Sequence, residues 1–313
     1  MKPPTVVVLL SDKRSGSTMF QEEICKHEDV QTVRYSPHTY LETQHWLKGA
    51  CLLGMPKQTF YGHRYPSSLQ RAGAARAYLV DELSGNLPDW RMPDTDREIV
   101  FDGWEALCNK FAKPVFFEKS PQHVAQWGSL SLMLDWIRTT SYSVRVIGLV
   151  RNPLSVMYSA DDLFHTDPDT RQHGWADMHR NLLAFQAMLP AEQFKLVRYE
   201  DLITNPVVGF SEVCQFIGVP SDARIGSSVH VSSRNKWLDD QRYDIHLHPS
   251  VIQVAKHFGY TDTELNNPQK QGIPISEKTL GRIRHLGLRI RSRLLHGLLK
   301  PMILGLGKKR VRK

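Results

Sequence analysis

The fold is decided by Thr5-Val-Val-Val-Leu-Leu-Ser-Asp-Lys-Arg-Ser-Gly-Ser-Thr-Met-Phe20. Its apolar run, Val6 to Leu10, is typical of a buried parallel strand. A polar loop with one glycine follows, and Met19 and Phe20 then begin an apolar pattern at helical spacing. A strand, a tight polar loop and a helix N-terminus together form an anion site, because loop amides and the positive end of the helix dipole point to one place. The stretch therefore predicts a loop that binds phosphate or sulfate.

This loop departs from the pattern G-x-x-x-x-G-K-[ST], which binds nucleoside triphosphates. Ser11 stands at the first Gly position and Ser17 at the Lys position, with Thr18 behind it. The positive charge lies upstream, at Lys13 and Arg14. Because the Lys that reaches the terminal phosphates is missing from its position, a Mg-dependent kinase is a less favoured alternative. A non-catalytic nucleotide-binding protein is another.

A second anion motif lies near the middle of the chain. Residues 144–151, Val-Arg-Val-Ile-Gly-Leu-Val-Arg, predict another buried strand. Asn152 is a good N-cap and Pro153 a good first residue of the helix that follows. Arg151 is therefore expected at the carboxyl edge of the sheet, where ligands of open α/β proteins bind. Ser159 follows about two helical turns later.

Together the two motifs resemble those of sulfotransferases that use 3′-phosphoadenosine 5′-phosphosulfate (PAPS) as donor. Arg-Ser-Gly-Ser-Thr resembles the 5′-phosphosulfate loop, and R-N-P-x-x-x-x-x-S resembles the 3′-phosphate motif. The resemblance covers about residues 5–260 and is nearest to soluble, bacterial-like enzymes of the carbohydrate type. It implies that the donor is bound by Lys13, Arg14, Ser15, Gly16, Ser17 and Thr18 at one end, and by Arg151 and Ser159 at the other.

The same resemblance implies catalytic residues in 115–121, Val-Phe-Phe-Glu-Lys-Ser-Pro. Many carbohydrate sulfotransferases use the Glu of such a string as the base, which here is Glu118. His123 is the rival base, since cytosolic sulfotransferases use a His after a Lys-Thr string. Lys119 is expected either to stabilise the transferring group or to pair with Glu118, and Arg14 to hold the leaving phosphate.

Two later segments also resemble the family. Residues 197–202, Val-Arg-Tyr-Glu-Asp-Leu, resemble a landmark that follows another strand, with Glu200 and Asp201 in mainly structural roles. Residues 232–237 resemble the segment that closes over the nucleotide. There Arg234 and Lys236 are expected at the 3′-phosphate, and Trp237 over the cofactor.

Strands are predicted near 5–10, 115–118, 144–150 and 194–198, with helices after the first three and across 207–217. Alternating strands and helices predict an α/β protein. The expected architecture is a P-loop-like three-layer fold, with a mainly parallel central sheet flanked by helices. Residues 1–275 are interpreted as the sulfotransferase domain and 276–313 as a basic amphipathic tail.

Residues 40–115 match no family pattern and are interpreted as insertions that bind the acceptor. Within them, 54–68 and 84–97 are rich in turn residues and predict loops. Aromatic side chains of this region either stack on sugar faces or belong to the core. They are Tyr61, Tyr65, Trp90 and Trp104.

The net charge of +8 belongs to the tail. Residues 278–313 hold twelve Lys or Arg and no acidic residue, whereas the preceding residues hold 28 basic and 32 acidic ones, a balance of −4. A basic amphipathic helix in this tail either lies on an anionic membrane or docks on the protein body. Nucleic acid is not expected as a partner, because the tail lacks interleaved aromatic residues.

The four cysteines are far apart and form no metal-binding pattern, so no metal is expected. No secretory signal or long apolar run is evident. These features favour a cytoplasmic enzyme, with peripheral binding to the inner face of a membrane as an option. The expected reaction transfers a sulfuryl group from PAPS to a hydroxyl of a carbohydrate or glycolipid. A hydroxyl or amine of a small metabolite is the alternative acceptor.

Overall fold

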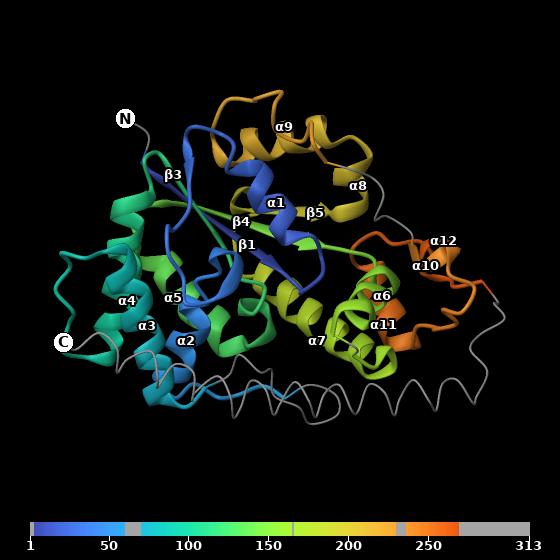
Figure 1. Cartoon of the computed structure of the whole chain (residues 1–313), viewed down its shortest axis with the longest axis horizontal. Coiled ribbons are helices and arrows are strands. Elements are labelled where there is room, and N and C mark those ends of the chain that lie inside the picture. Colours follow the sequence, from blue (N-terminus) through green and yellow to red (C-terminus); the bar gives the residue numbers. More distant parts are fainter. Residues whose placement is uncertain (1–2, 60–69, 165, 230–235, 269–313) are drawn as a thin grey trace, which may run out of the picture. The chain divides into compact units, whose positions relative to one another are not determined.

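The computed structural model describes residues 3–59, 70–164, 166–229 and 236–268 (Figure 1). Arg234, Tyr61, Tyr65 and the basic tail therefore lie outside the described residues. The chain divides into two compact units. The first comprises Met1–Trp237 and Ile245–Asn266, and it holds the sheet and every predicted donor-binding and catalytic residue. The second comprises Leu238–Asp244 and Asn267–Lys313, and in it the Asn267 side-chain amide donates to the Tyr243 carbonyl at 2.9 Å.

A five-stranded sheet forms the centre of the first unit, in the order β2-β3-β1-β4-β5, and every pairing in it is parallel. The strands are β1 (Thr5–Ser11), β2 (Val30–Gln31), β3 (Val115–Lys119), β4 (Ser143–Val150) and β5 (Phe194–Arg198). β1 lies in the middle, with Val8 opposite Glu118 and Leu9 opposite Lys119 on β3. All strands run the same way, so their carboxyl ends meet at one edge.

Helices pack on both faces of this sheet (Figure 1). The α-helices are α1 (Ser17–Ile24), α2 (His45–Leu52), α3 (Ala72–Asn86), α4 (Asp96–Phe111), α5 (Trp127–Thr139), α6 (Pro153–Phe164), α7 (Pro168–Gln186), α8 (Tyr199–Thr204), α9 (Pro206–Ile217), α10 (Lys236–Asp239), α11 (Pro249–Lys256) and α12 (Asp262–Leu265). Short 3-10 turns are η1 (Thr39–Leu41), η2 (His123–Ala125) and η3 (Ala191–Gln193).

Side chains that alternate along the strands build one core on each face. On one face Val7, Leu9 and Phe117 join a cluster with α1, α8 and α9, in which the Phe20 ring lies 6.0 Å from Phe117 and 5.2 Å from Phe210. On the other face, Phe116 meets Trp104 of α4 with ring centroids 5.6 Å apart. Glu118 is two residues beyond Phe116, so it faces the layer that holds α2, α4 and α5.

The predicted α/β three-layer architecture is confirmed. Four of the five strands lie where the periodicity predicts them, and α9 ends at Gly218, whose φ of 86° makes the left-handed turn typical of a helix end. β2 was not predicted, because two residues carry no periodic signal. The loop prediction for 84–97 is wrong at both ends, since α3 continues to Asn86 and α4 begins at Asp96.

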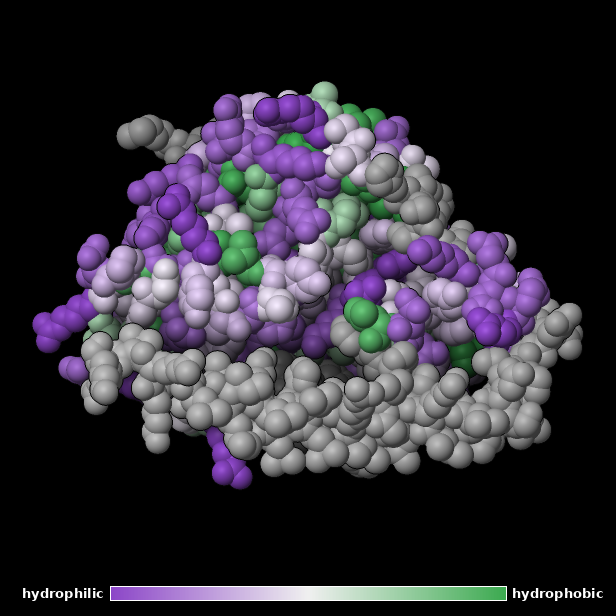
Figure 2. All heavy atoms as spheres, viewed as in Figure 1, coloured by the Kyte–Doolittle hydropathy of each residue, from purple (hydrophilic) through white to green (hydrophobic). Residues whose placement is uncertain are grey.

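Of the two alternatives for Trp104, sugar stacking or a place in the core, the structure shows the core. Its ring is fully buried between Trp46, Phe116 and Trp136. Trp90 is half-buried. The face drawn in Figure 2 is mainly hydrophilic over the described residues, with apolar residues in small groups. None of the described helices combines the length and hydropathy that a membrane span requires.

Candidate active site

The loop after β1 turns sharply into α1 at Gly16, whose φ of 91° lies in the left-handed region. A Cβ at this position would lie 2.4 Å from Cε2 of Tyr199, so the Tyr199 ring packs directly against the loop backbone. Ser17 and Thr18 form the first turn of α1, where backbone N–H groups have no partner inside the helix. The local geometry is therefore that of an anion site at a helix N-terminus.

The two predicted phosphate motifs meet through Arg14. Its Nε donates to Oγ of Ser159 on α6 at 2.9 Å, although 145 positions separate them in the chain. Arg151 follows β4, and its guanidinium donates to the Arg14 carbonyl at 3.1 Å. The same guanidinium lies 4.4 Å from the centroid of the Tyr199 ring. Burial lowers the pKa of Arg151, but an arginine stays charged at neutral pH. Two cations thus lie beside one helix N-terminus.

Trp237 lies beside the same helix. It is 3% exposed, and its indole N–H donates to Oγ of Ser155 at 3.1 Å. Ser155 and Ser159 are four residues apart and share one face of α6. Lys236 is exposed at the start of α10. Trp237 is therefore brought to the α6 face that carries Ser159.

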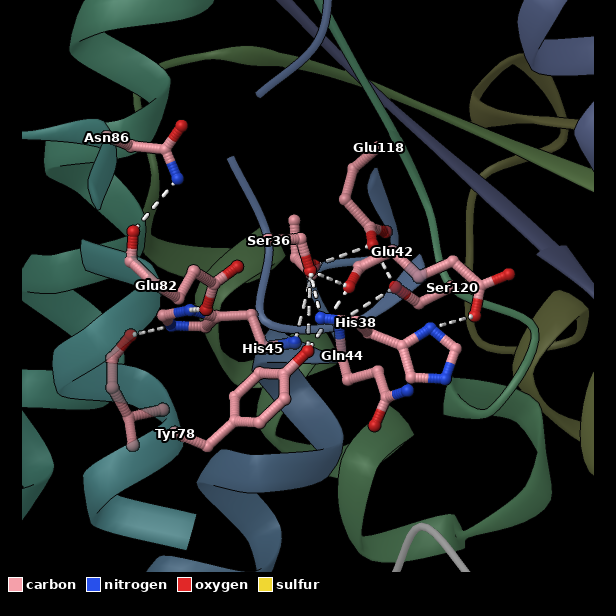
Figure 3. Close-up of polar contacts among 12 residues, drawn as sticks. Ser36, His38, Glu42, Gln44, His45, Tyr78, Glu82, Asn86, Glu118 and Ser120 are labelled. Carbon is pink, nitrogen blue, oxygen red and sulfur yellow. Dashed lines mark hydrogen bonds and ion pairs between the residues drawn. The ribbon is translucent and has the colours of Figure 1, made fainter. Parts of the chain in front are cut away.

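Glu118 is the penultimate residue of β3 and is 1% exposed (Figure 3). Its Oε1 accepts hydrogen bonds from the hydroxyls of Thr43 (2.7 Å) and Ser120 (2.5 Å). Burial raises its pKa to about 7, and the nearby Glu82 adds to that rise, while the two hydroxyls oppose it. A carboxyl of this pKa exchanges a proton near neutral pH, which is what a general base requires.

The imidazole of His123 lies beside the second Glu118 oxygen. Its Nδ1 lies 3.6 Å from Glu118 Oε2, and both side chains are fully buried. Burial and the neighbouring His45 lower the pKa of His123 to about 3. His123 is therefore neutral at physiological pH, and its imidazole is a weaker base than the Glu118 carboxylate.

Lys119 pairs with Glu42. The Lys119 Nζ lies 3.0 Å from Glu42 Oε1, and Gln122 Nε2 donates to Glu42 Oε2 at 2.8 Å. His38 Nδ1 lies 3.1 Å from the same Oε2. Burial opposes ionisation of Glu42, but these donors and the Lys119 charge outweigh it and lower its pKa to about 2. Lys119 is expected either to stabilise the transferring group or to pair with Glu118. In the structure its ion pair is with Glu42 and not with Glu118.

A second buried pair flanks Glu118 from α2 and α3. His45 Nδ1 lies 3.1 Å from Glu82 Oε2, and His45 Nε2 lies 2.8 Å from the Val100 carbonyl. Both side chains are fully buried, and burial raises the pKa of Glu82. Residues 40–115 thus bring titratable groups of their own beside Glu118.

Glu200 has the structural position that the sequence predicts. Its Oε1 accepts from the Asn152 backbone N–H at 2.9 Å, and its Oε2 accepts from the Tyr260 hydroxyl at 2.8 Å. Asn152 Oδ1 in turn accepts from the Leu154 N–H, as an N-cap does. Asp201 is exposed and lies 3.7 Å from the Arg198 guanidinium. Glu200 therefore fixes the turn that carries Arg151.

Sequence reasoning missed Glu42, Thr43, His45 and Glu82. They lie in the insertion, where no family pattern was available, and contact between distant polar residues leaves no periodic signal. Ser120 lies within the quoted Glu-Lys-Ser-Pro string and was passed over. Among the described residues, no three His, Cys, Asp or Glu side chains are grouped so as to hold a metal ion.

Comparison with known proteins identifies the family of the chain. The model of the sulfotransferase family matches residues 4–223. The chain is similar in structure to the sulfotransferase domain from the olefin synthase of Synechococcus PCC 7002, with a TM-score of 0.55 at 19% identity, over 83% of this chain and 96% of that one.

It is equally similar to the sulfotransferase domain from the curacin biosynthetic pathway, with a TM-score of 0.55 at 20% identity, over 83% and 99% of the two chains. No curated protein sequence matches this chain significantly. At these identities the structures speak for the fold, and the family match carries the assignment. The chain is an enzyme that belongs to the sulfotransferase family.

Proposed function

We propose that this enzyme transfers a sulfuryl group from PAPS to a hydroxyl of a carbohydrate or glycolipid. The observation that carries the donor assignment is the Arg14–Ser159 hydrogen bond, with Arg151 on the Arg14 carbonyl. It joins the loop after β1 to the helix after β4, so one edge holds two cations suited to two phosphates. PAPS carries two separate anionic groups, which fits such a double site.

In the proposed reaction, the acceptor oxygen attacks the donor sulfur in line. The new S–O bond forms as the bond between sulfur and the bridging phosphate oxygen breaks. Arg14 and the N–H groups at the start of α1 stabilise the charge that develops on the departing phosphate. The acceptor hydroxyl gives its proton to Glu118, and 3′-phosphoadenosine 5′-phosphate leaves.

The acceptor class rests on two sequence strings. The Arg-Ser-Gly-Ser-Thr and Glu-Lys-Ser-Pro strings resemble those of carbohydrate sulfotransferases. The two similar domains belong to an olefin synthase and a biosynthetic pathway, which keeps a small-metabolite hydroxyl or amine as the second candidate. A screen of sugars, glycolipids and small alcohols and amines with sulfate-labelled donor distinguishes the two classes.

We also propose that residues 278–313 hold the enzyme on the inner face of a membrane in the cytoplasm. Support comes from the twelve basic residues of this segment and its apolar residues at helical spacing. A glycolipid acceptor would then be found where the enzyme resides.

The catalytic assignment is tested by replacing each candidate base. Glu118→Gln should lower turnover at least about a hundredfold, because a general base contributes that much. Its affinity for 3′-phosphoadenosine 5′-phosphate should stay within about twofold, since the carboxyl lies on a different strand from Arg151. Near-normal turnover of Glu118→Gln, together with an inactive His123→Ala, would assign the base to His123 instead.

A further inference from the structure

Residues 40–44, here called the strap, have an unusual backbone. Tyr40, Leu41 and Gln44 have φ angles of 58°, 52° and 53°, in the left-handed region that residues with a Cβ rarely adopt. Such conformations persist only where the surrounding structure fixes them, and they gather at functional sites. We therefore expect the contacts of the strap to fix its backbone and to serve a function at the site.

Two sets of contacts hold the strap, and Figure 3 shows its residues Glu42 and Gln44 with Ser120 and Tyr78. From the sheet side, Lys119 and Gln122 donate to the Glu42 carboxylate, and the Ser120 hydroxyl accepts from the Gln44 N–H at 2.9 Å. From the insertion, the Tyr78 hydroxyl donates to the Glu42 carbonyl at 3.2 Å. Thr43 lies between Glu42 and Gln44, the two residues that these contacts hold.

Thr43 and Ser120 act on the same oxygen of the base. Both hydroxyls donate to Glu118 Oε1, at 2.7 and 2.5 Å. Thr43 Oγ1 also accepts from the His45 N–H at 3.3 Å, which orients its own proton toward Glu118. Glu118 Oε2 has no hydrogen-bond partner within the described part of the chain. The two oxygens of one carboxylate thus have different roles available to them.

We propose that Thr43 is a positioning residue that, with Ser120, turns Glu118 so that Oε2 takes the proton from the acceptor. The proposal deepens the proposed function and rests on it. A hydrogen bond to the ionised carboxylate also favours ionisation, so Thr43 extends the working range of the base toward lower pH.

Other titratable groups lie around Glu118, and their charges also act on its pKa. His123 of η2 and Lys119 of β3 lie beside it, Glu82 approaches from α3, and His45 stands on α2 next to Glu82. The strap adds Glu42, which is neutralised by Lys119. Tyr78 of α3 is also close enough to the Glu118 carboxylate to feel its charge. Thr43→Val changes none of these charges, so its effect on the pH profile is separable from theirs.

The test is the pH dependence of kcat/KM in Thr43→Val, which keeps the side-chain shape and removes the donor. The acid limb of the profile should move up by about one pH unit, because a hydrogen bond to a charged group is worth about that much. Turnover below the limb should fall about tenfold, with the affinity for 3′-phosphoadenosine 5′-phosphate unchanged. Thr43→Ser keeps the hydroxyl and should restore the wild-type limb.

Thr39→Val is the matched control, since Thr39 is exposed just before the strap. It should leave the profile unchanged. The positioning role of Thr43 is overturned if the acid limb of Thr43→Val does not move while the separate variant Glu118→Gln is inactive. Glu118 then remains the proposed base. An active Glu118→Gln would instead overturn the proposed function. Should Thr43→Val not fold, Thr43→Ala takes its place and must show the same shift.

Discussion

The Glu118 carboxyl is 1% exposed, and its removal from water raises its pKa from 4.5 to about 7. Between these two values the folded protein holds a proton that the unfolded chain releases. Folding stability therefore falls as pH rises from about 4.5 to about 7, and stays lowered above that range. The cost reaches about 3 kcal/mol in the fully ionised state, at about 1.4 kcal/mol for each pKa unit.

Glu118→Gln should accordingly be more stable than the wild type at pH 8 and nearly equal to it at pH 5. A neutral amide can accept from Thr43 and Ser120 without the cost of a buried charge. We expect a gain of about 1–3 kcal/mol in the free energy of unfolding at pH 8, measured with urea. Glu22→Gln, at an exposed position, is the control. The same difference at both pH values would contradict the raised pKa.

Among the individual residues of the candidate site, the sequence predicted Glu118 and Arg14 but not Thr43. Glu118 lies at the end of an apolar run, where a charged residue is conspicuous. Thr43 lies in a segment with three left-handed residues. A glycine would have indicated such a backbone in the sequence, but Leu41 and Gln44 do not. Its contact with Glu118 joins residues 75 positions apart, which local patterns cannot encode.

Among the elements, the turn from β1 into α1 carries the tightest constraint. Gly16 has a φ of 91° and lies under the Tyr199 ring, which also meets the Arg151 guanidinium. One small residue thus sets how closely β1, β4 and β5 can bring their loops together. Strands β1, β3, β4 and β5 follow from alternation and apolar runs, which is why their bounds were predicted within two residues.

Gly16→Ala should destabilise the protein by about 2 kcal/mol or more, because it adds both backbone strain and a steric clash. Gly54→Ala separates the two causes, since Gly54 has a φ of 67° but open space around it. It should cost about 1 kcal/mol. The measurement is urea unfolding, and equal costs at the two glycines would rule out the packing of Tyr199 as a constraint.

Helices α2 to α4 show why the insertion could not be predicted. α3 buries Glu82 and Asn86 as well as Leu79 and Leu83, so its inward face is not uniformly apolar. The Asn86 side-chain oxygen accepts hydrogen bonds from the backbone N–H groups of residues 34 and 35, and the Glu82 carboxylate pairs with His45. Polar residues with buried partners hide the period by which helices are detected.

At the scale of the whole molecule, charge is divided unevenly along the chain. The residues before 278 carry a balance of −4, and residues 278–313 carry +12. An anionic surface should therefore attract the segment 278–313 and not the catalytic body.

Truncation before residue 278 should release the protein from anionic liposomes and leave the affinity for 3′-phosphoadenosine 5′-phosphate unchanged. Neutral liposomes are the control, and raised salt should weaken binding of the full chain. Equal pelleting of both forms with anionic liposomes would contradict the membrane role.

The proposed donor binds at the carboxyl edge of the sheet, with a separate site for each of its two phosphates. Calorimetric titration of the full chain with 3′-phosphoadenosine 5′-phosphate tests it directly, beside Arg151→Ala and beside ATP with and without Mg²⁺. We expect tight binding that needs no Mg²⁺, a loss of about 2–3 kcal/mol in Arg151→Ala, and weak binding of ATP. Binding of ATP that depends on Mg²⁺ and equals or exceeds that of the 3′-phosphorylated nucleotide would contradict the account.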